Sequence, residues 1–313
     1  MEFFLLFAGL FGLWLGTEST IHGAVEVAEH LRVPEFIVGL TVLSIGSDLP
    51  ELAIAVDAAI LNLHAGQASD VVVGSALGSC LGQIGFVLGI IGLIGYLVLP
   101  EKAIYQQGGV LLGSLVLLAV FGYDGQVTRV EGVVLVVVYV VYLLVIFVDV
   151  MTPGEIDENN SDRSLALSLA YLVVGLVIVV VSAEVTVSSA IAVAAKLDVK
   201  QSFVAIVIIG LGSSLPELSI SVGAVLKRRT TLSVGNLIGS NIFDTLVPVG
   251  VAAVIAGLEF EGEMWRQELP FLFVLTSVVL FFFFRRAGIQ KFEAIIILGL
   301  YIGYVTTEFL GAF

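Results

Sequence analysis

Two short segments of the chain place a carboxylate directly after a proline inside an apolar stretch. They read Gly46-Ser47-Asp48-Leu49-Pro50-Glu51 and Gly212-Ser213-Ser214-Leu215-Pro216-Glu217. A proline within a helix cannot donate the backbone hydrogen bond to the residue four positions earlier, and it displaces that turn. We therefore expect carbonyl oxygens to become available near the glycine and serine of each segment, beside Glu51 and Glu217. Carboxylate, hydroxyl and carbonyl oxygens are the ligands of hard cations such as calcium.

A second pair of segments repeats a glycine-serine pattern ahead of an amide or acid. These are Gly78-Ser79-Cys80-Leu81-Gly82-Gln83 and Gly239-Ser240-Asn241-Ile242-Phe243-Asp244. In each, the serine and the last residue are four positions apart, so their side chains share one face of a helix. The glycines predict close contact between helices. Together the four segments predict a cage of oxygen ligands deep in the protein.

The elements that carry these segments are transmembrane helices. Of the 313 residues, 58% are hydrophobic and 13% are charged, whereas a soluble domain has about a quarter charged residues. Long apolar runs such as 133–148 fill much of the chain, and a membrane-spanning helix needs about 20 such residues. Runs such as 111–121 are apolar on every side and lack the alternation of a transmembrane β-barrel. We predict an all-α polytopic membrane protein with about ten hydrophobic segments: 3–29, 35–62, 70–98, 104–122, 130–150, 164–195, 200–226, 231–257, 268–285 and 290–311.

Charge and residue usage exclude several kinds of partner. The net charge of −14 argues against nucleic acid, because phosphate binding requires clustered Lys and Arg. One cysteine, Cys80, and three histidines offer no Cys/His metal cluster, and we expect no cofactor. The N-terminus lacks the basic region and cleavage site of a removable signal peptide, so we expect it to form the first span, in a multi-pass protein of the cell membrane.

The chain contains an internal repeat. A shift of 166 residues places segment 46–52 on 212–218, and a shift of 161 places 74–79 on 235–240. We predict a first five-helix repeat over 1–150, an acidic cytoplasmic linker over 151–163 and a second repeat over 164–313. Because each repeat has an odd number of spans, the two enter the membrane from opposite sides, which is an inverted repeat typical of transporters.

The orientation follows from the Lys and Arg residues in the connecting loops. With the N-terminus outside, nine of them lie in cytoplasmic loops and four in outer loops. Cytoplasmic loops are enriched in Lys and Arg. The count favours an external N-terminus and a cytoplasmic linker.

The doubled G-[ST]-x-L-P-E segment, each copy followed by G-S-x-x-x-[NQD], resembles the alpha repeats of the calcium/cation antiporter superfamily, and within it the prokaryotic sodium/calcium exchangers. The likeness covers essentially the whole chain. It implies antiport of Ca2+ against Na+ by alternating access, in which the first and sixth spans slide as a pair. It also implies shared calcium and sodium ligands in Glu51 and Glu217, with further contributions from backbone carbonyls of Ser44, Ser47, Gly210 and Ser213, hydroxyls of Ser79, Ser214 and Ser240, and the side chains of Gln83 and Asp244.

Two positions depart from the family pattern. Asp48 stands where these exchangers usually have serine, and Gln83 stands where they usually have asparagine. With Glu51, Glu217 and Asp244, Asp48 raises the possible charge of the cage to −4, and one calcium ion offsets two of these charges. Close carboxylates disfavour one another's ionisation. We therefore expect Asp48 to take up a proton or an extra cation, which would alter coupling or admit protons as counter-ion.

Three other functions compete with sodium/calcium exchange. A proton-coupled exchanger of calcium or another divalent cation is the main alternative, motivated by Asp48. A passive cation channel could also use rings of carboxylates, but multi-ligand cages and inverted repeats favour antiport. An intramembrane protease would need glycine-flanked aspartates, a serine-histidine pair or H-E-x-x-H; segment 122–125, Gly-Tyr-Asp-Gly, lies in a predicted loop and fits none of them. We therefore do not expect an enzyme.

Overall fold

The computed structural model describes residues 2–65, 69–151, 164–196, 214–259, 262–286 and 288–309. Helices dominate these ranges, and the chain divides into two compact units. Unit 1 takes residues 1–47 and 155–236, and unit 2 takes 48–154 and 237–313, so each unit combines segments from both halves of the sequence. Residues 152–163 of the predicted linker lie outside the described residues.

The described helices of unit 1 follow the predicted first, sixth and seventh segments, the first part of the second segment and the start of the eighth. They are α1 (Glu2–Leu31), α2 (Glu35–Val38), the π-helix η1 (Gly39–Leu43), α3 (Ser44–Ser47), α9 (Leu165–Lys196), α11 (Leu215–Leu226) and the first part of α12 (Thr230–Ala256).

Unit 2 contains the rest of α12 together with the elements from α4 to α8 and from β3 to α14. They are α4 (Leu49–Ala65), α5 (Ser69–Leu81), the π-helix η2 (Gly82–Val87), α6 (Leu88–Ile94), β1 (Leu97–Val98), α7 (Glu101–Phe121), the short 3-10 helix η3 (Gly122–Asp124), β2 (Gln126–Val127), α8 (Arg129–Met151), β3 (Leu258–Glu259), α13 (Gly262–Arg286), β4 (Gly288–Ile289) and α14 (Lys291–Phe309).

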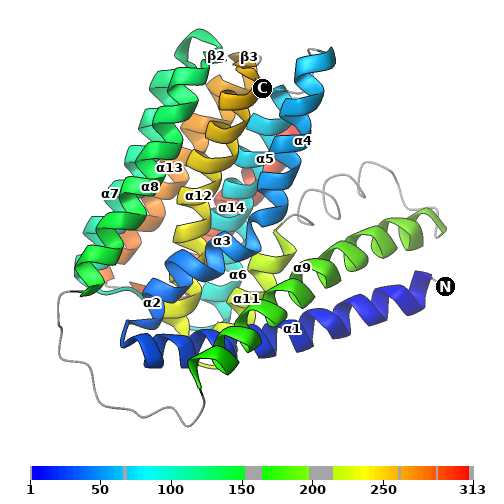
Figure 1. Cartoon of the computed structure of the whole chain (residues 1–313), viewed down its shortest axis with the longest axis vertical. Helices are drawn as coiled ribbons and strands as arrows, with labels where there is room; N and C mark the ends of the chain where they lie inside the picture. Colours follow the sequence, from blue (N-terminus) through cyan, green and yellow to red (C-terminus); the bar gives the residue numbers. More distant parts are fainter. Residues whose placement is uncertain are drawn as a thin grey trace. The chain divides into compact units, whose positions relative to one another are not determined.

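The long pair α1 and α9 forms the larger part of unit 1, and the two helices lie side by side (Figure 1). They are antiparallel, because Glu2 at the start of α1 pairs with Lys196 at the end of α9, and Glu26 accepts a hydrogen bond from Ser168 near the start of α9. Glycines spaced by seven residues allow the contact: a Cβ at Gly23 would lie 2.4 Å from the backbone nitrogen of Leu172. The pairing of the first and sixth spans is thus built on backbone-to-backbone approach.

Short strands close the loops of unit 2. Strand β1 pairs antiparallel with β4, and β2 pairs antiparallel with β3. The predicted third segment ran to residue 98, but its helix ends at Ile94. Gly95 is extended, with φ −145° and ψ 162°, and the following residues Leu97 and Val98 pair with Ile289 and Gly288. A pairing with residues almost two hundred positions away overrides the local apolar pattern.

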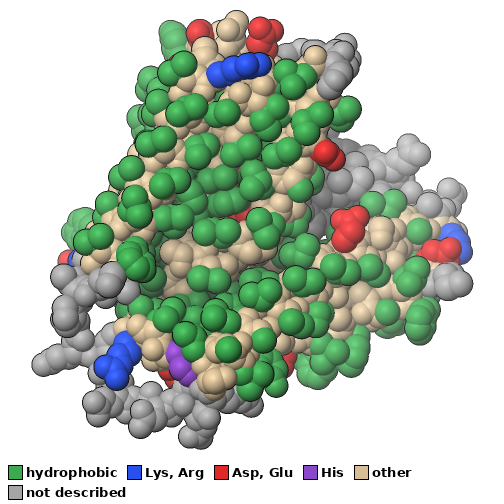
Figure 2. Space-filling view, in the orientation of Figure 1, with side chains coloured by type: hydrophobic (Ala, Val, Ile, Leu, Met, Phe, Trp, Pro, Cys, Tyr) green, Lys and Arg blue, Asp and Glu red, His purple; other side chains and the backbone are tan. Residues whose placement is uncertain are grey.

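The fold is that of an all-α polytopic membrane protein. Among the described residues, seven helices are long and apolar enough to cross a membrane, and eight if the helix pair broken at Asp48 counts as one span; ten spans remain a prediction. Figure 2 shows hydrophobic side chains over most of the visible face. In the most apolar stretch of α12, 83% of the residues are buried, against 28% for α8. Helix α8 therefore faces lipid, whereas α12 is a core helix.

Candidate cation site

The first proline segment interrupts its helix, as its sequence predicts. Helix α3 ends at Ser47, Asp48 lies in a bend, and α4 begins at Leu49, with the backbone N–H of Leu52 donating to the Asp48 carbonyl at 3.2 Å. The π-helix η1 ahead of this break was not foreseen. It places a second irregularity in the same span, and π-helical turns are frequent at functional sites.

The second proline segment forms the start of α11. Ser214 is the N-cap residue, and Glu217 lies in the first turn. The spacing S-x-x-E is that of a capping box, in which the serine hydroxyl would accept a backbone N–H. Ser214 makes no such side-chain bond, and among the described residues its buried Oγ has no hydrogen-bond partner. The pattern therefore does not serve as a helix cap, and the hydroxyl stays available.

Unit 1 brings four of the predicted site residues to neighbouring elements. Helix α3, with Ser44 and Ser47, packs against α11, with Ser214 and Glu217, and all four side chains are buried. The hydroxyl of Ser44 donates to the Leu40 carbonyl at 2.9 Å, and the Ser44 carbonyl accepts the Ser47 hydroxyl at 3.3 Å. Because both serine hydroxyls bond to their own helix, any role of these two residues in ion binding falls to their carbonyls, which have a second lone pair.

Unit 2 brings together the second pair of segments through one glutamine. The amide Nε2 of Gln83 donates to Ser79 Oγ and to Asp244 Oδ2, both at 3.1 Å, and Gln83 Oε1 accepts from Asn241 Nδ2 at 2.8 Å. The four side chains are buried. Every polar group of the Gln83 amide is therefore engaged, and the glutamine ties the first-half serine to the second-half aspartate.

Asp48 and Glu51 lie at the start of α4 in unit 2, and both are buried. Tyr139 of α8 lies within electrostatic range of Asp48 and Asp244. Its ring contacts Phe243 edge-on, with centroids 5.5 Å apart. Among the described residues, its buried hydroxyl has no hydrogen-bond partner. Sequence reasoning missed Tyr139, because nothing in its apolar segment distinguishes it from a lipid-facing tyrosine.

Some predicted site residues lie outside the described residues, and one predicted helix contact is absent among those described. Ser213 and Gly210 lie outside the described residues. The expected close helix contact at Gly78 is wrong for the part of the chain described, since a Cβ there would meet nothing within 4 Å. Sequence reasoning assigned no role to Asn241, which donates to Gln83. The signal for it was that a polar amide stands where the first repeat has Cys80, at the shift of 161 residues. Among the described side chains, no three of His, Cys, Asp and Glu gather to hold a metal ion.

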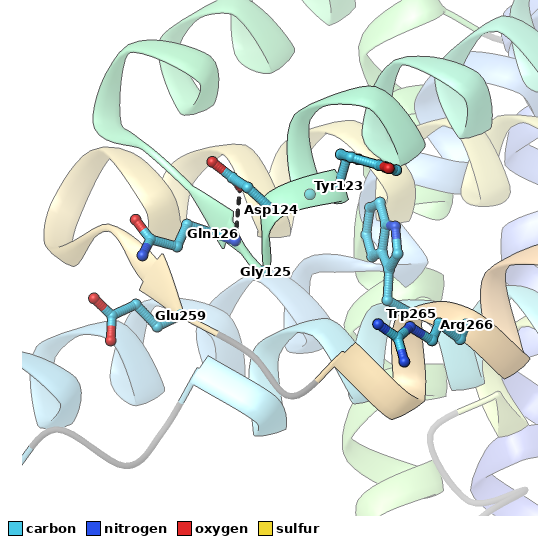
Figure 3. A pocket seen from close by; sticks show the side chains of 8 residues that line it. Tyr123, Asp124, Gly125, Gln126, Glu259, Trp265 and Arg266 are labelled. Carbon is cyan, nitrogen blue, oxygen red and sulfur yellow. Dashed lines mark hydrogen bonds between the residues drawn. The ribbon is translucent and has the colours of Figure 1, made fainter.

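A separate hollow lies at one end of unit 2, with a volume of about 420 Å³ (Figure 3). It is lined by the α7–α8 connection, by Glu259, and by Trp265 and Arg266 of α13. Within it, Asp124 Oδ1 accepts the backbone N–H of Gln126 at 3.2 Å. The aspartate thus stabilises a turn, in the loop where the sequence placed it. None of the predicted cation ligands lines this hollow.

The comparisons with known proteins identify the family. The family described as sodium/calcium exchanger protein matches residues 1–148 and 167–310. The chain belongs to this family. An uncharacterized membrane protein of Methanocaldococcus jannaschii, MJ0091, is 32% identical over 96% of this chain and 95% of its own length. The sodium/calcium exchanger MaX1 of Methanosarcina acetivorans is 23% identical over 99% of both chains.

Solved structures of the sodium-calcium exchanger NCX_Mj share the fold. One of them, soaked with 10 mM Na+ and zero Ca2+, has a TM-score of 0.84 and 28% identity, and the match covers 98% of each chain. The resemblance that the doubled segments indicated is thereby confirmed, as is the fold class. At the level of the family, the chain is a membrane transporter and an exchanger of sodium and calcium.

Proposed function

We propose that this chain exchanges Ca2+ for Na+ by alternating access, with both ions bound near the middle of the membrane. The observation that carries the proposal is the equivalence of Glu51 and Glu217. Each follows a proline at the start of a helix, and each is buried, with exposed fractions of 4% and 0%. Each also has a buried serine within four residues in sequence, Ser47 for Glu51 and Ser214 for Glu217. A buried carboxylate in a membrane helix is costly and marks function by default.

In this proposal the other ligands complete the ion coordination that Glu51 and Glu217 begin. The carbonyls of Ser44, Ser47, Gly210 and Ser213 and the hydroxyls of Ser79, Ser214 and Ser240 complete the coordination of sodium and calcium, and Gln83 and Asp244 line the middle. A calcium ion takes six to eight oxygen ligands, more than the carboxylates supply. The neutral oxygens beside Glu51 and Glu217 are therefore part of the site rather than its surroundings.

Asp48 tunes the exchange rather than defining it. Its side chain is buried near the start of α4, in a position three residues before Glu51. Two carboxylates at this spacing compete for ionisation unless a cation lies between them. The proposal predicts that Asp48→Ser changes the ratio of sodium to calcium or the pH dependence of exchange. If both stay as in the parent protein, Asp48 has no part in coupling.

The proposal is tested by radiocalcium uptake into proteoliposomes with the membrane potential clamped. Three conditions are compared: an outward sodium gradient, an outward proton gradient and no gradient. Uptake driven by sodium alone supports the proposal. Uptake driven by protons would replace sodium with a proton as the counter-ion and make Asp48 the coupling residue. Fast flux without any counter-ion gradient would instead identify a channel.

The residue assignment is tested separately. Glu51→Gln and Glu217→Gln keep the shape of the side chain and remove its charge, and we expect each nearly to abolish calcium uptake while the protein still inserts into the membrane. The matched control is Glu101→Gln, because Glu101 is exposed at the start of α7. Parent-level uptake by both site variants would contradict the assignment.

We also propose that the N-terminus lies outside the cell and that residues 151–163 lie in the cytoplasm. The distribution of Lys and Arg supports this orientation. A cysteine introduced at Ser161 should react with an impermeant thiol reagent in inside-out vesicles and remain unreacted in intact cells. The reverse result would invert the orientation.

A further inference from the structure

Beyond Glu217, small polar side chains continue along the same face of α11. Ser221 lies four residues after Glu217, which is one helical turn. Its side chain is 0% exposed, and its Oγ has no hydrogen-bond partner among the described residues. A serine hydroxyl in a helix usually bonds to the carbonyl one turn earlier. The free hydroxyl of Ser221 therefore needs another explanation.

A matching row lies on the first turns of α12. Asn236 is 0% exposed, and neither its Oδ1 nor its Nδ2 has a hydrogen-bond partner among the described residues. An amide has two donors and an acceptor, and leaving a buried polar group unsatisfied costs about 1–3 kcal/mol. On α12, Ser233, Asn236, Ser240 and Asp244 share one face of the helix, since they follow one another at three- or four-residue steps.

The parts of the two rows that belong to unit 1, Ser221 on α11 and Ser233 and Asn236 on α12, lie at the contact of these helices. The hydroxyl of Ser233 donates to the backbone carbonyl of Ser221 at 3.1 Å. The backbone of η1 reaches the same place, because a Cβ at Gly39 would lie 3.0 Å from the nitrogen of Asn236 and 2.3 Å from the carbonyl oxygen of Leu232. Ser221 thus lies at the contact of α11 with α12, Asn236 lies at the contact of α12 with η1, and both side chains are buried.

The rows lead toward one face of the membrane. Helix α11 ends at Leu226, and α12 begins at Thr230, so from Glu217 to the end of α11 the distance is roughly 14 Å at 1.5 Å per residue. That is about half the thickness of the hydrocarbon core. At the turn between the helices, Lys227 pairs with Glu18 and Arg229 pairs with Glu35. These pairs offset two of the three positive charges of segment 227–229, which would otherwise repel a cation.

We propose that Ser221 and Asn236 form a transit site for a partly dehydrated hard cation between Glu217 and the α11–α12 turn. The inference rests on the proposed function for the identity of the cations, Na+ and Ca2+. A serine hydroxyl and an amide oxygen replace part of a hydration shell without adding charge. A neutral site of this kind binds weakly enough to release the ion, as a conduction path requires.

Comparison of the two repeats indicates that the transit site serves only one face of the membrane. At the shifts that match the two halves, Ser221 corresponds to Ala55 and Asn236 to Ser75. The first half thus lacks one of the two polar groups. In an inverted repeat, corresponding positions serve opposite faces of the membrane. The transit site therefore belongs to the face of the α11–α12 turn.

The first test is the sodium dependence of exchange, measured from each face of the membrane with vesicles of known orientation. Asn236→Ala and Ser221→Ala should raise the half-saturating sodium concentration three- to tenfold at the face of the α11–α12 turn, and leave the opposite face unchanged. The control is Ser219→Ala on the same helix, because the Ser219 hydroxyl bonds to Thr17 at 2.6 Å. Equal shifts at both faces, or no shift at either, would overturn the proposal.

The second test does not depend on transport. The only cysteine of the chain, Cys80, is buried, so Ser221→Cys and Asn236→Cys each provide one accessible thiol at most. An impermeant thiol reagent applied at the face of the α11–α12 turn should label both variants, and Na+ or Ca2+ should slow the labelling. Absence of labelling from that face, or labelling that neither ion slows, would overturn the transit site. Ion-sensitive labelling without sodium-driven calcium uptake would refute the proposed function alone.

Discussion

The two glycine-serine segments of unit 2 match in sequence but differ in backbone. In the second half, Ser240 and Asp244 lie on α12, which continues from Thr230 to Ala256 even though it contains Pro248. In the first half, Ser79 lies on α5, and Gln83 lies in the π-helix η2. A π-helical turn holds an extra residue, so side chains beyond Gln83 point in directions that their counterparts on α12 do not share. Matching residues thus do not guarantee matching helices.

The chemistry of the two segments is complementary rather than equal. Gln83 donates to Asp244 Oδ2, and Gln83 in turn accepts from Asn241. An aspartate in place of Gln83 would put two carboxylates in contact, which disfavours their ionisation. The two copies of the segment have therefore diverged. The first copy supplies the hydrogen-bond donor Gln83, the second supplies the acceptor Asp244, and their hydrogen bond stabilises the contact between the two segments.

Among variants of these two segments, the largest expected effect comes from Asp244→Asn, which makes both members of the Gln83–Asp244 pair amides. Asp244→Asn removes the charged acceptor, and hydrogen bonds to charged groups contribute about 1.5–3 kcal/mol. We expect a 10- to 100-fold loss in apparent calcium affinity in exchange assays. Gln83→Asn, which keeps the amide, should cost only a few-fold.

The double variant Gln83→Asp/Asp244→Gln tests whether the division itself matters. It restores one donor and one acceptor with the sides exchanged, and we expect it to recover part of the affinity that Asp244→Asn loses. If the double variant binds calcium no better than the single one, the position of the charge matters more than the pairing.

A smaller effect is expected at the two positions matched between the segments, Asn241 and Cys80. Asn241→Ala leaves the buried Gln83 Oε1 without its donor, at a cost of about 1–3 kcal/mol in the free energy of unfolding. Cys80→Ala removes only weak sulfur contacts at 3.7 Å, and we expect about 1 kcal/mol or less. Thermal unfolding in detergent measures both, and equal losses would show that the glutamine network does not stabilise the fold.

The last pair of variants concerns the π-helix η2, and it includes the smallest effect, that of Gly78→Ala. A Cβ at Gly85 would lie 2.5–2.7 Å from the Tyr301 ring and its Cβ on α14, so Gly85→Ala should cost about 1–3 kcal/mol through overpacking. Gly78→Ala is the control, because a Cβ there meets nothing within 4 Å. It should be neutral, or stabilise the helix by up to about 1 kcal/mol. Unfolding midpoints compare them, and a tolerated Gly85→Ala would mean that Tyr301 can move aside.

Much of the fold follows from local sequence. Most helices of the described ranges begin and end within a few residues of the predicted segments, because a membrane helix satisfies its backbone hydrogen bonds within one apolar stretch. The third span ends earlier than predicted, α13 begins at Gly262 rather than at 268, and residues 200–213 of the seventh segment lie outside the described residues. The interruption beside Pro50 also follows from a local cause, the missing amide hydrogen. The family resemblance depended on the same short segments, and the family match confirms it.

The tertiary structure alone decided which groups meet. The antiparallel pairing of α1 with α9, the strand pair β1–β4 and the Gln83–Asp244 hydrogen bond each join residues far apart in the chain. The π-helices η1 and η2 lie where glycines allow another segment to approach. Hydropathy and residue spacing show which segments form apolar helices. The direction of a hydrogen bond between helices and the position of the extra residue in a π-helical turn depend on the helix that packs against that segment.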